Sequence, residues 1–486
     1  MNWIATGLAG AALAAAVLPA ALPPVQETAG TAQAWMVQAA EPAAARRTLH
    51  FAQGTASVTE TVQKGVSVRI CALPNGDTVK MARLTAPAGE ACVEEVRLEG
   101  GGTLRWYDAQ AGQWQSQPLR AGTVRTGCAV ITMESGGELF LYTPKVYEPL
   151  ERATARHLPA LDGSIELRQD GGGWTLRVLL PSLPAGCEAD YLLLTGREAL
   201  FDWSDEAAVY AAWSAHDTLD DTGKWRYDGY YYRSPDTYVP AGADCYYRQP
   251  SAYLIEHYLN QAADCRAAWD LAAACLDVMA RQQNVYGYFP TQPESQWLAE
   301  DYGIGPGFYD TRFNSDLAEN FYRFGQLGRC REFDAVMDRY FDFYLTFAAD
   351  HHQETRNGGW LVDDYGDPAG AGALHTSLNH QLSEILTLYR FSEVLARPEL
   401  SALAERMLQA VEDTETAWIA PGGDLHYAVF ADGRYGNADY PYLTYNDLFK
   451  LRQYLASQGR TVPAVQRLMD AKRAWMDAHG VTEYLR

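Results

Sequence analysis

The first long part of the chain alternates apolar and polar residues in short runs. Residues 67–71 (Ser-Val-Arg-Ile-Cys) show the alternation of a half-buried strand. Three more pairs of runs flank turns that contain glycine: 109–112, 135–137 and 170–173. Short strands joined by such turns are typical of antiparallel hairpins. The pattern therefore predicts an antiparallel β domain, a sandwich or a barrel, over residues 46–203.

After about residue 204 the apolar period lengthens to that of helices. Eight segments show it: 252–260, 265–282, 316–327, 332–348, 377–395, 400–411, 446–457 and 464–479. Asn314, Ser315 and Thr376 precede two of them as candidate N-caps. Long loops rich in Gly, Asp and Tyr separate the helices, and such loops often carry function. Paired helices with these loops at one end predict an α/α toroid over residues 204–486; the alternative is an irregular helical domain.

The N-terminus resembles an export segment. Residues 4–21 form an uncharged run of mostly apolar residues, and Ala32-Gln33-Ala34 offers a small-residue cleavage site. No Lys or Arg precedes the run, which departs from the usual pattern. We expect a signal peptide over residues 1–34, a linker over 35–45, and a secreted or cell-envelope location. No later run is long and apolar enough to suggest another membrane span.

The composition of the chain argues against several classes of binding partner. The chain has 486 residues, 48% hydrophobic and 21% charged, which suits a soluble protein of two or three domains. Its formal net charge of −22 argues against nucleic acid, an anionic membrane and a heavily sulfated chain as partners. Its 30 Tyr and 13 Trp suit sugar rings and hydroxyls, although most aromatic side chains are expected to pack inside.

Eight cysteines raise the question of disulfides, which an exported chain permits. Their spacings fit no zinc template. Cys265 and Cys275 fall on one predicted helix, about 15 Å apart and too far to bridge. We predict mostly buried free thiols, with Cys71–Cys92 as the candidate pair. No metal or cofactor is expected.

Three loops share a tyrosine, and two of them place a carboxylate close to it. They cover residues 359–365, 423–427 and 439–448, and predicted helices separate them. Such an arrangement suits a proton-transfer site at the mouth of a helical barrel.

The same segments carry a resemblance to the D-glucuronyl C5-epimerase family, in its C-terminal α/α-toroid domain. Residues 360–365 resemble the family's Trp-Tyr-Glu-Glu-Tyr loop, and residues 377–389 resemble its Leu-Asn-Gly helix. Residues 423–427 resemble its Gly-x-Ile-Tyr segment, and residues 439–448 resemble its Asp-Tyr-His-x-x-His-x-Asn-Gln-Leu signature. The likeness covers roughly residues 355–458 and is weaker back to about 250.

This chain departs from the family pattern in three places. Asp363-Asp364 replaces the paired Glu, one methylene shorter. Pro441, Tyr442 and Tyr445 stand where the family has His. In the segment 423–427, His426 and Tyr427 both remain candidates for the family's catalytic Tyr position.

The resemblance implies cofactor-independent C5 epimerisation of a uronic acid, of the glucuronate-to-iduronate type, within a polysaccharide. That reaction needs a base on one face of the sugar, an acid on the other, and donors or a cation on the carboxylate. By resemblance, Tyr440 and Asp364 work on one face and Tyr427 or His426 on the other, while Tyr365 supports the carboxylate loop. Apart from the resemblance, Tyr440 is expected to pack against the start of the last helix pair. Asp364 is then expected to be a loop carboxylate that caps a helix or is solvated.

Further residues are candidates for substrate binding. Arg312 offers a planar fork for a uronate carboxylate, with a structural pair to Asp310 or Asp316 as the alternative. Tyr309 is expected to face a glycan. The remaining candidates come from the family-like segments: Trp360, Asp363, Asn379 and His380. His380, like His375, is alternatively a satisfied residue lining the toroid.

Three rival functions remain open. A polysaccharide lyase shares the proton abstraction but expels the glycoside and leaves an unsaturated product. A glycoside hydrolase would recruit Asp363 or Asp364 with Asp310 or Asp439. A non-catalytic glycan-binding envelope protein would keep only the aromatic groove. The sequence leaves open the glycan, the order of base and acid, the effect of the shorter carboxylates, and whether the chain pairs as a homodimer.

Overall fold

The computed structural model describes residues 45–108, 110–206, 209–210, 214 and 222–486. The predicted signal peptide and all but the last residue of the predicted linker lie outside these ranges.

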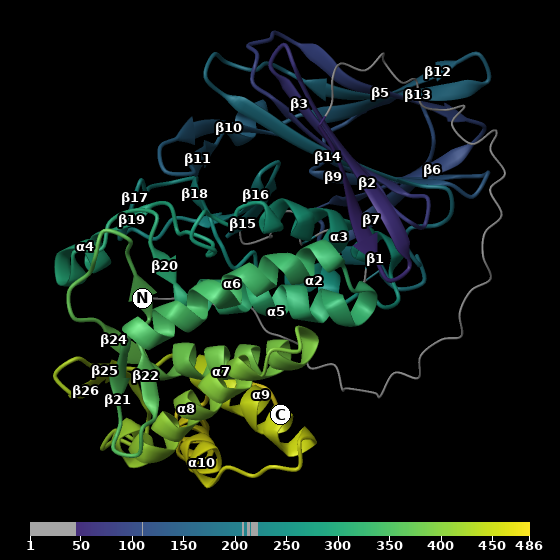
Figure 1. Cartoon of the computed structure of the whole chain (residues 1–486). Coiled ribbons are helices and arrows are strands. Elements are labelled where there is room, and N and C mark those ends of the chain that lie inside the picture. Colours follow the sequence, from purple (N-terminus) through teal and green to yellow (C-terminus); the bar gives the residue numbers. More distant parts are fainter. Residues whose placement is uncertain (1–44, 109, 207–208, 211–213, 215–221) are drawn as a thin grey trace.

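The strand-rich part forms two antiparallel sheets that pack face to face (Figure 1). The large sheet follows the order β1 (Ala45–Phe51), β2 (Gly54–Gln63), β3 (Val66–Ala72), β4 (Thr78–Leu84), β14 (Glu188–Gly196), β10 (Glu138–Leu150), β11 (Thr154–His157), β18 (Cys245–Arg248), β16 (Gly229–Arg233) and β15 (Gly223–Arg226). Beside β10 it branches through β9 (Cys128–Met133), β6 (Gly102–Asp108) and β7 (Gln113–Pro118). The second sheet has the order β5 (Ala91–Glu99), β13 (Gly173–Leu180), β12 (Ser164–Asp170) and β8 (Gly122–Val124).

The hairpins predicted around the glycine turns are confirmed. β6 pairs with β7, β9 with β10, and β12 with β13, all antiparallel. The alternating apolar residues of both sheets meet in one buried cluster that includes Leu104, Ile131, Leu141, Leu167 and Leu176. Burial of the inner face of the second sheet explains the period of two in its strands, whereas β10 and β14 of the large sheet are buried on both faces.

The large sheet continues past residue 203, where the β domain was predicted to end. β16 pairs with β18, and β18 pairs with β11. These strands are rich in Tyr, which favours strands, but they are too short to show an alternating pattern. The change from strand to helix therefore comes near residue 250.

All eight predicted helices are present, with ends shifted by a few residues. They are α2 (Ile255–Leu259), α3 (Arg266–Ala280), α5 (Thr311–Gly328), α6 (Arg331–Asp350), α7 (Leu378–Val394), α8 (Pro398–Thr414), α9 (Leu443–Ser457) and α10 (Pro463–Ala478). The chain also forms α4 (Gln296–Tyr302), which was not predicted, and two 3-10 turns, Pro159–Leu161 and Glu415–Trp418.

The helices stack in two layers. α5 contacts α2 and α7, and α7 contacts α9, which gives an inner layer. α8 contacts α6, α7 and α10, which gives an outer layer. This double layer is the kind of arrangement that the toroid prediction expected. α3 lies between the inner layer and the large sheet (Figure 1).

The caps predicted for two helices are wrong: Asn314 and Ser315 both lie inside α5, and Thr376 lies one residue before the N-cap of α7. α5 begins at Thr311, because the Asp310 carboxylate accepts a hydrogen bond from Phe313 N (2.9 Å) and caps the helix. Asn314 instead lies inside α5, where its amide bonds to the backbone of Phe289. α7 has Ser377, not Thr376, at its N-cap position.

In the described part of the chain, three pairs of short strands and one small three-stranded sheet lie outside the two main sheets. β17 (Tyr238–Val239) pairs with β19 (Glu294–Ser295), β20 (Tyr309–Asp310) with β23 (Tyr365–Gly366), and β21 (His352–Glu354) with β22 (Trp360–Val362). β25 (His426–Phe430) pairs with both β24 (His375–Ser377) and β26 (Tyr435–Ala438). The pairings β17–β19, β20–β23 and β24–β25 connect segments far apart in the sequence, whereas β21–β22 and β25–β26 are local hairpins.

The eight cysteines are all free thiols, as predicted for most of them, and the Cys71–Cys92 pair is wrong. Cys71 lies in β3 of the large sheet and Cys92 in β5 of the second sheet. Burial raises the pKa of the Cys71 thiol, so it stays protonated and unreactive.

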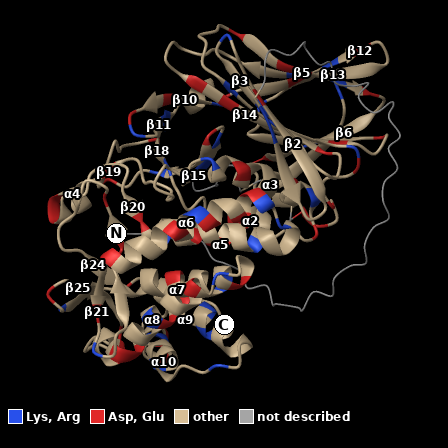
Figure 2. Ribbon diagram, viewed as in Figure 1, with Lys and Arg blue, Asp and Glu red and all other residues tan. Residues whose placement is uncertain are grey.

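Basic positions are scattered among acidic ones along the ribbon, without a basic stretch on any one element in this view (Figure 2). Within the described ranges no helix has the length and apolar character needed to span a membrane.

Candidate proton-transfer site

The candidate site lies where the N-terminal ends of three inner-layer helices meet the short strand pairs. Asp310 caps α5, Ser377 precedes α7, and Tyr440 lies three residues before α9. β20 pairs with β23 beside Asp364, and β24 pairs with β25, which carries Tyr427. The three tyrosine loops predicted from the sequence therefore converge.

Asp364 is the buried anion of the site. It is 0% exposed, and its oxygens accept hydrogen bonds from the Ser377 backbone N–H (2.8 Å) and the Ser377 hydroxyl. Burial acts to raise the pKa of Asp364, but His380, His375 and Ser377 together outweigh it and hold the pKa below its ordinary value. Asp364 is therefore a carboxylate at neutral pH.

A polar chain runs from Asp364 toward the surface. His375 Nε2 lies 3.3 Å from Asp364 Oδ2, and the Tyr302 hydroxyl lies 2.8 Å from His375 Nδ1. The Asp364 carboxylate thus lies at ion-pair distance from the imidazole, while His375 Nε2 makes no hydrogen bond within the described residues. Sequence reasoning treated His375 only as a lining residue and missed Tyr302, which lies on the unpredicted helix α4.

Tyr427 and Tyr440 face each other. Their ring centroids are 5.7 Å apart in a T-shaped contact, and the Tyr427 ring lies 5.9 Å from that of His375. His426 contacts Tyr435 instead (6.4 Å). Successive side chains of a strand point to opposite faces, so only one of the two candidates on β25 can face the cluster, and it is Tyr427.

The two phenols are partly exposed but strongly desolvated. Burial and the neighbouring Tyr440 raise the pKa of Tyr427 well above its ordinary value. Burial also raises the pKa of Tyr440, with the charge of Arg312 acting in the opposite direction. Both phenols are therefore protonated at neutral pH and are proton donors in the resting protein.

Two further carboxyl groups titrate near neutrality. Burial, together with the charge of Asp364, raises the pKa of Asp310 to about 7 and that of Asp363 also to about 7. A group with a pKa near the working pH can both accept and donate a proton. Tyr365 lies over this region, 7% exposed, with its ring 5.7 Å from His375 and 5.8 Å from His380.

Arg312 is bonded to protein carboxylates. Its Nη1 lies 2.6 Å from Asp447 Oδ2, its Nε lies 3.0 Å from Asp316 Oδ1, and Nη1 also donates to the Asn379 carbonyl (3.2 Å). The alternative of a structural pair with Asp316 is thus present, and Asp447 adds a second partner. A substrate carboxylate would have to share this guanidinium.

The other predicted binding residues differ in position. Tyr309 lies in the core: it is 1% exposed, and its hydroxyl lies 3.0 Å from that of Tyr340. The expectation that it faces a glycan is wrong, because the aromatic residues of α6 cover it. Trp360 stacks on His352 (3.9 Å) under Arg406, with no contact to the cluster among the described residues.

His380 and Asn379 lie beneath the cluster. His380 is 6% exposed, its Nδ1 lies 2.8 Å from Thr311 Oγ1, and burial lowers its pKa to about 4. It is therefore a neutral imidazole at neutral pH. Asn379 is 2% exposed and contributes its carbonyl to Arg312, so neither side chain is open to a large substrate.

One buried lysine connects the two tyrosine segments. Lys472 of α10 is 0% exposed, and its Nζ lies 2.6 Å from Asp424 Oδ1 and 2.8 Å from Asp439 Oδ2. Asp424 precedes Tyr427 by three residues and Asp439 directly precedes Tyr440. Asp439, considered as a hydrolase carboxylate, is thus engaged in an ion pair.

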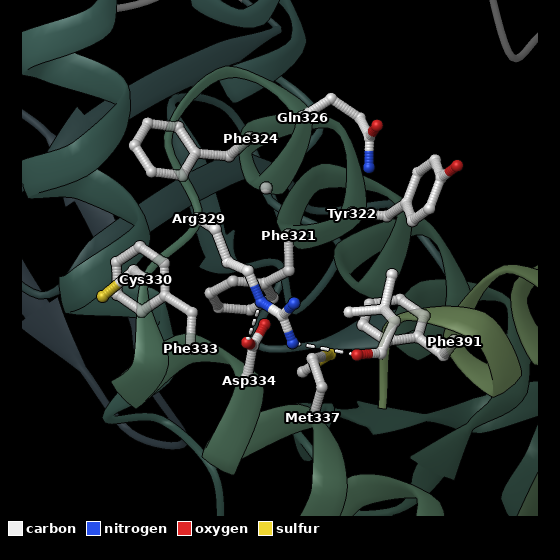
Figure 3. A pocket seen from close by; sticks show the side chains of 12 residues that line it. Phe321, Tyr322, Phe324, Gln326, Arg329, Cys330, Phe333, Asp334, Met337 and Phe391 are labelled. Atoms are coloured by element: carbon white, nitrogen blue, oxygen red, sulfur yellow. Dashed lines mark hydrogen bonds and ion pairs between the residues drawn. The ribbon is translucent and has the colours of Figure 1, made fainter. Parts of the chain in front are cut away.

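A pocket of about 230 Å³ lies elsewhere, at the C-terminal ends of α5 and α7 (Figure 3). Phe321, Phe324 and Phe333 line it, and Arg329 at its side bonds to Asp334 (2.6 Å). It contains none of the clustered acid–base residues, so we do not assign it to the reaction. The described part of the chain holds no group of His, Cys, Asp and Glu suited to a metal.

No protein-family model and no curated protein matches the chain. Similar solved structures include the cellobiose 2-epimerase of Spirochaeta thermophila (16% identity, 47% of this chain and 59% of that one, TM-score 0.36). Two others are the unsaturated glucuronyl hydrolase of Bacillus sp. GL1 (16%, 47% and 61%, 0.32) and a D-mannose isomerase (12%, 55% and 70%, 0.39). The chain spans about three fifths of the first two. Similarity at this level assigns no family to it.

Proposed function

We propose that this protein is a carbohydrate-active enzyme that removes and returns a proton at C5 of a uronic acid residue within a polysaccharide. One observation carries the proposal: the phenols of Tyr427 and Tyr440 face each other, and the Tyr427 ring lies against His375, whose Nε2 is 3.3 Å from Asp364. Proton transfer at carbon needs such paired acid–base groups on a desolvated surface. An exported protein would meet its polysaccharide outside the cytoplasm.

The pKa values suggest how the protons move. Both phenols are protonated at rest, so one of them can donate directly to the carbanion. The other must first lose its proton to serve as base. Asp310, with a pKa of about 7 and close enough to raise the pKa of Tyr440, is the acceptor that we assign to this step.

Charge sets the main condition on the substrate. Asp310, Asp363 and Asp364 make the cluster acidic, and a uronate adds a further negative charge. Arg312 is the cation whose field reaches Tyr440, although Asp447 and Asp316 already bind it. A uronate would therefore bind best when Asp363 is protonated, whereas Asp310 must be ionised to accept the proton of the base tyrosine. These opposite requirements predict an activity maximum near pH 7.

Glycoside hydrolysis is the second candidate, and a specific observation favours it. Asp310 and Asp363 each have a pKa of about 7, the property of a general-acid carboxyl that is still protonated at neutral pH. A neutral sugar would also avoid the repulsion that a uronate meets here.

The test is NMR of polysaccharides that contain glucuronate, incubated with the protein in D₂O. We expect deuterium at C5 without chain cleavage. Tyr440→Phe and Tyr427→Phe should each lower the exchange rate about 100-fold or more, because each removes an acid–base group. Tyr435→Phe on β26, which contacts Trp418 and His426 and not the facing phenols, is the matched control and should retain exchange.

Each other result has a defined meaning. An unsaturated product with C5 exchange would make the protein a lyase. Cleavage with new reducing ends and no exchange would make it a hydrolase. Binding without either reaction would leave a glycan-binding protein, and equal exchange in Tyr440→Phe and wild type would contradict the assigned roles.

A further inference from the structure

Trp297 is a large aromatic residue that remains exposed beside the buried cluster. It is 36% exposed, whereas His375 next to it is 1% exposed. The Trp297 ring lies 5.7 Å from the His375 ring, 5.9 Å from that of Tyr302 and 6.1 Å from that of Tyr365. The indole therefore lies over the same imidazole that contacts Tyr427.

Helix α4 holds Trp297 firmly. Ser295 caps the helix, Gly303 ends it in a left-handed conformation (φ 71°), and Ile304 N bonds back to the Leu298 carbonyl (3.2 Å). Leu298 and Ile304 pack with Phe308, Tyr365 and Leu374 in a small apolar cluster. Burial of Leu298 in this cluster thus fixes the position of α4 and of its partly exposed indole, so little ordering is needed on binding.

A further contact of α4, at its N-terminal end, connects it to the rest of the candidate site. Its N-terminal residue Gln296 donates to the Thr237 carbonyl (2.8 Å), and β19 pairs with β17, which carries Tyr238. Asp310 and Tyr440 both act electrostatically on Tyr238, which places this strand beside them. Trp297 is therefore part of the rim of the acid–base cluster and not a separate patch.

We propose that Trp297 is a stacking platform for a pyranose ring, the subsite that holds the sugar next to the reacting residue. The C–H face of a pyranose is apolar and matches an indole face, while its hydroxyls remain available for hydrogen bonds. Trp297 Nε1 makes no hydrogen bond to any residue within the described ranges, so it can donate to a sugar hydroxyl. This assignment rests on the proposed function for the identity of the site, but it concerns binding and not proton transfer.

The experiment measures affinity by isothermal titration calorimetry. The probes are a hexasaccharide of alternating glucuronate and N-acetylglucosamine, and cellohexaose as a neutral counterpart. We expect wild type to bind at least one of them and Trp297→Ala to bind it about tenfold or more weakly. Trp297→Phe, which keeps an aromatic face but lacks the N–H, should fall between them.

Tyr286→Ala is the matched control, because Tyr286 is 59% exposed and stacks on Tyr288, away from the cluster. It should bind as wild type does. Thermal unfolding of each variant must remain within a few degrees of wild type for the comparison to hold, and Trp297→Phe provides the test if Trp297→Ala unfolds.

Failure of the subsite and failure of the proposed reaction give different results. Weaker binding in Trp297→Ala without C5 exchange by wild type would keep the subsite and remove the epimerase. C5 exchange by wild type with unchanged affinity in Trp297→Ala and Trp297→Phe would support the proposed epimerase reaction and reject the Trp297 subsite. No binding of either hexasaccharide by wild type would overturn the assignment of the subsite.

Discussion

Two opposing effects act on the protonation state of the Asp310 carboxyl group. As the N-cap of α5 its carboxyl group accepts the Phe313 N–H, which favours the charged form. Its burial and the nearby Asp364 charge favour the neutral form and prevail, so the pKa rises to about 7. An ionised Asp310 at high pH is therefore a destabilising group that the fold tolerates at the site.

This conflict predicts how stability depends on pH. A carboxyl group whose folded-state pKa is raised binds more protons in the folded than in the unfolded protein. Its stabilising contribution is complete below its ordinary pKa of 3.8 and is lost as pH rises through about 7. Asp310→Asn keeps a helix cap but cannot ionise, so it should be more stable than wild type above neutral pH, by roughly 4 kcal/mol.

Urea unfolding at several pH values measures this effect. The difference between Asp310→Asn and wild type should shrink toward zero as pH falls below about 4. Asp350→Asn, at an exposed position near the end of α6, should show little of this dependence. A difference that does not change with pH would contradict the raised pKa.

At the scale of elements, local periodicity was sufficient for the long helices and the hairpins. α7 and α8, for example, carry buried apolar residues at helical spacing over 17 residues each. α4 was missed because its 7 residues are too few to establish a period, and only Leu298 among them is buried. Because α4 was not predicted, Tyr302 and Trp297, which lie on it, were not predicted as site residues.

The candidate site was predictable only in part. Asp364, Tyr427 and Tyr440 come from loops with a recognisable composition, and the structure brings them together. Strands of two or three residues such as β20, β23 and β24 make the connection, and no local pattern signals pairings so short and so distant in sequence. The partners of Arg312 were likewise hidden, because Asp447 is 135 residues away.

Lys472 connects the outer-layer helix α10 to both tyrosine-bearing segments through its ion pairs. Removing its charge leaves the buried Asp439 and the half-buried Asp424 near each other without their shared cation. We expect Lys472→Met to destabilise the protein by about 3 kcal/mol, the usual effect of breaking a buried ion pair. It should also loosen the β25–β26 hairpin, which hydrogen exchange of its backbone amides would detect.

Two control variants separate the effect of the Lys472 ion pairs from a general loss of charge on α10. Arg473→Met changes a neighbouring exposed cation of α10 and should cost well under 1 kcal/mol. Lys472→Arg retains the charge and should recover part of the lost stability. Faster exchange spread evenly over the whole protein, and not concentrated in β25 and β26, would show that Lys472 has no special relation to this hairpin.

At the scale of the whole molecule, the sheet and the helices share one interior. A single apolar cluster extends from Val58 and Leu194 of the large sheet through Leu271 of α3 to Leu448 of α9. Ion pairs cross the same boundary: Arg47 bonds to Asp277, and Arg266 to Asp77. The boundary predicted at residue 203 therefore falls within the large sheet, and the sheet and the helices on its two sides share one interior.

A shared interior predicts cooperative unfolding. Differential scanning calorimetry should give one transition for the whole chain, with the calorimetric and van't Hoff enthalpies close to each other. Arg266→Met, which leaves the fully buried Asp77 unpaired, should lower that transition by the equivalent of roughly 2–3 kcal/mol without splitting it. Glu198→Gln removes an exposed partner of the same guanidinium and should hardly shift it. Two resolved transitions in wild type would contradict the shared interior, because they would mean that the sheet and the helices can unfold separately.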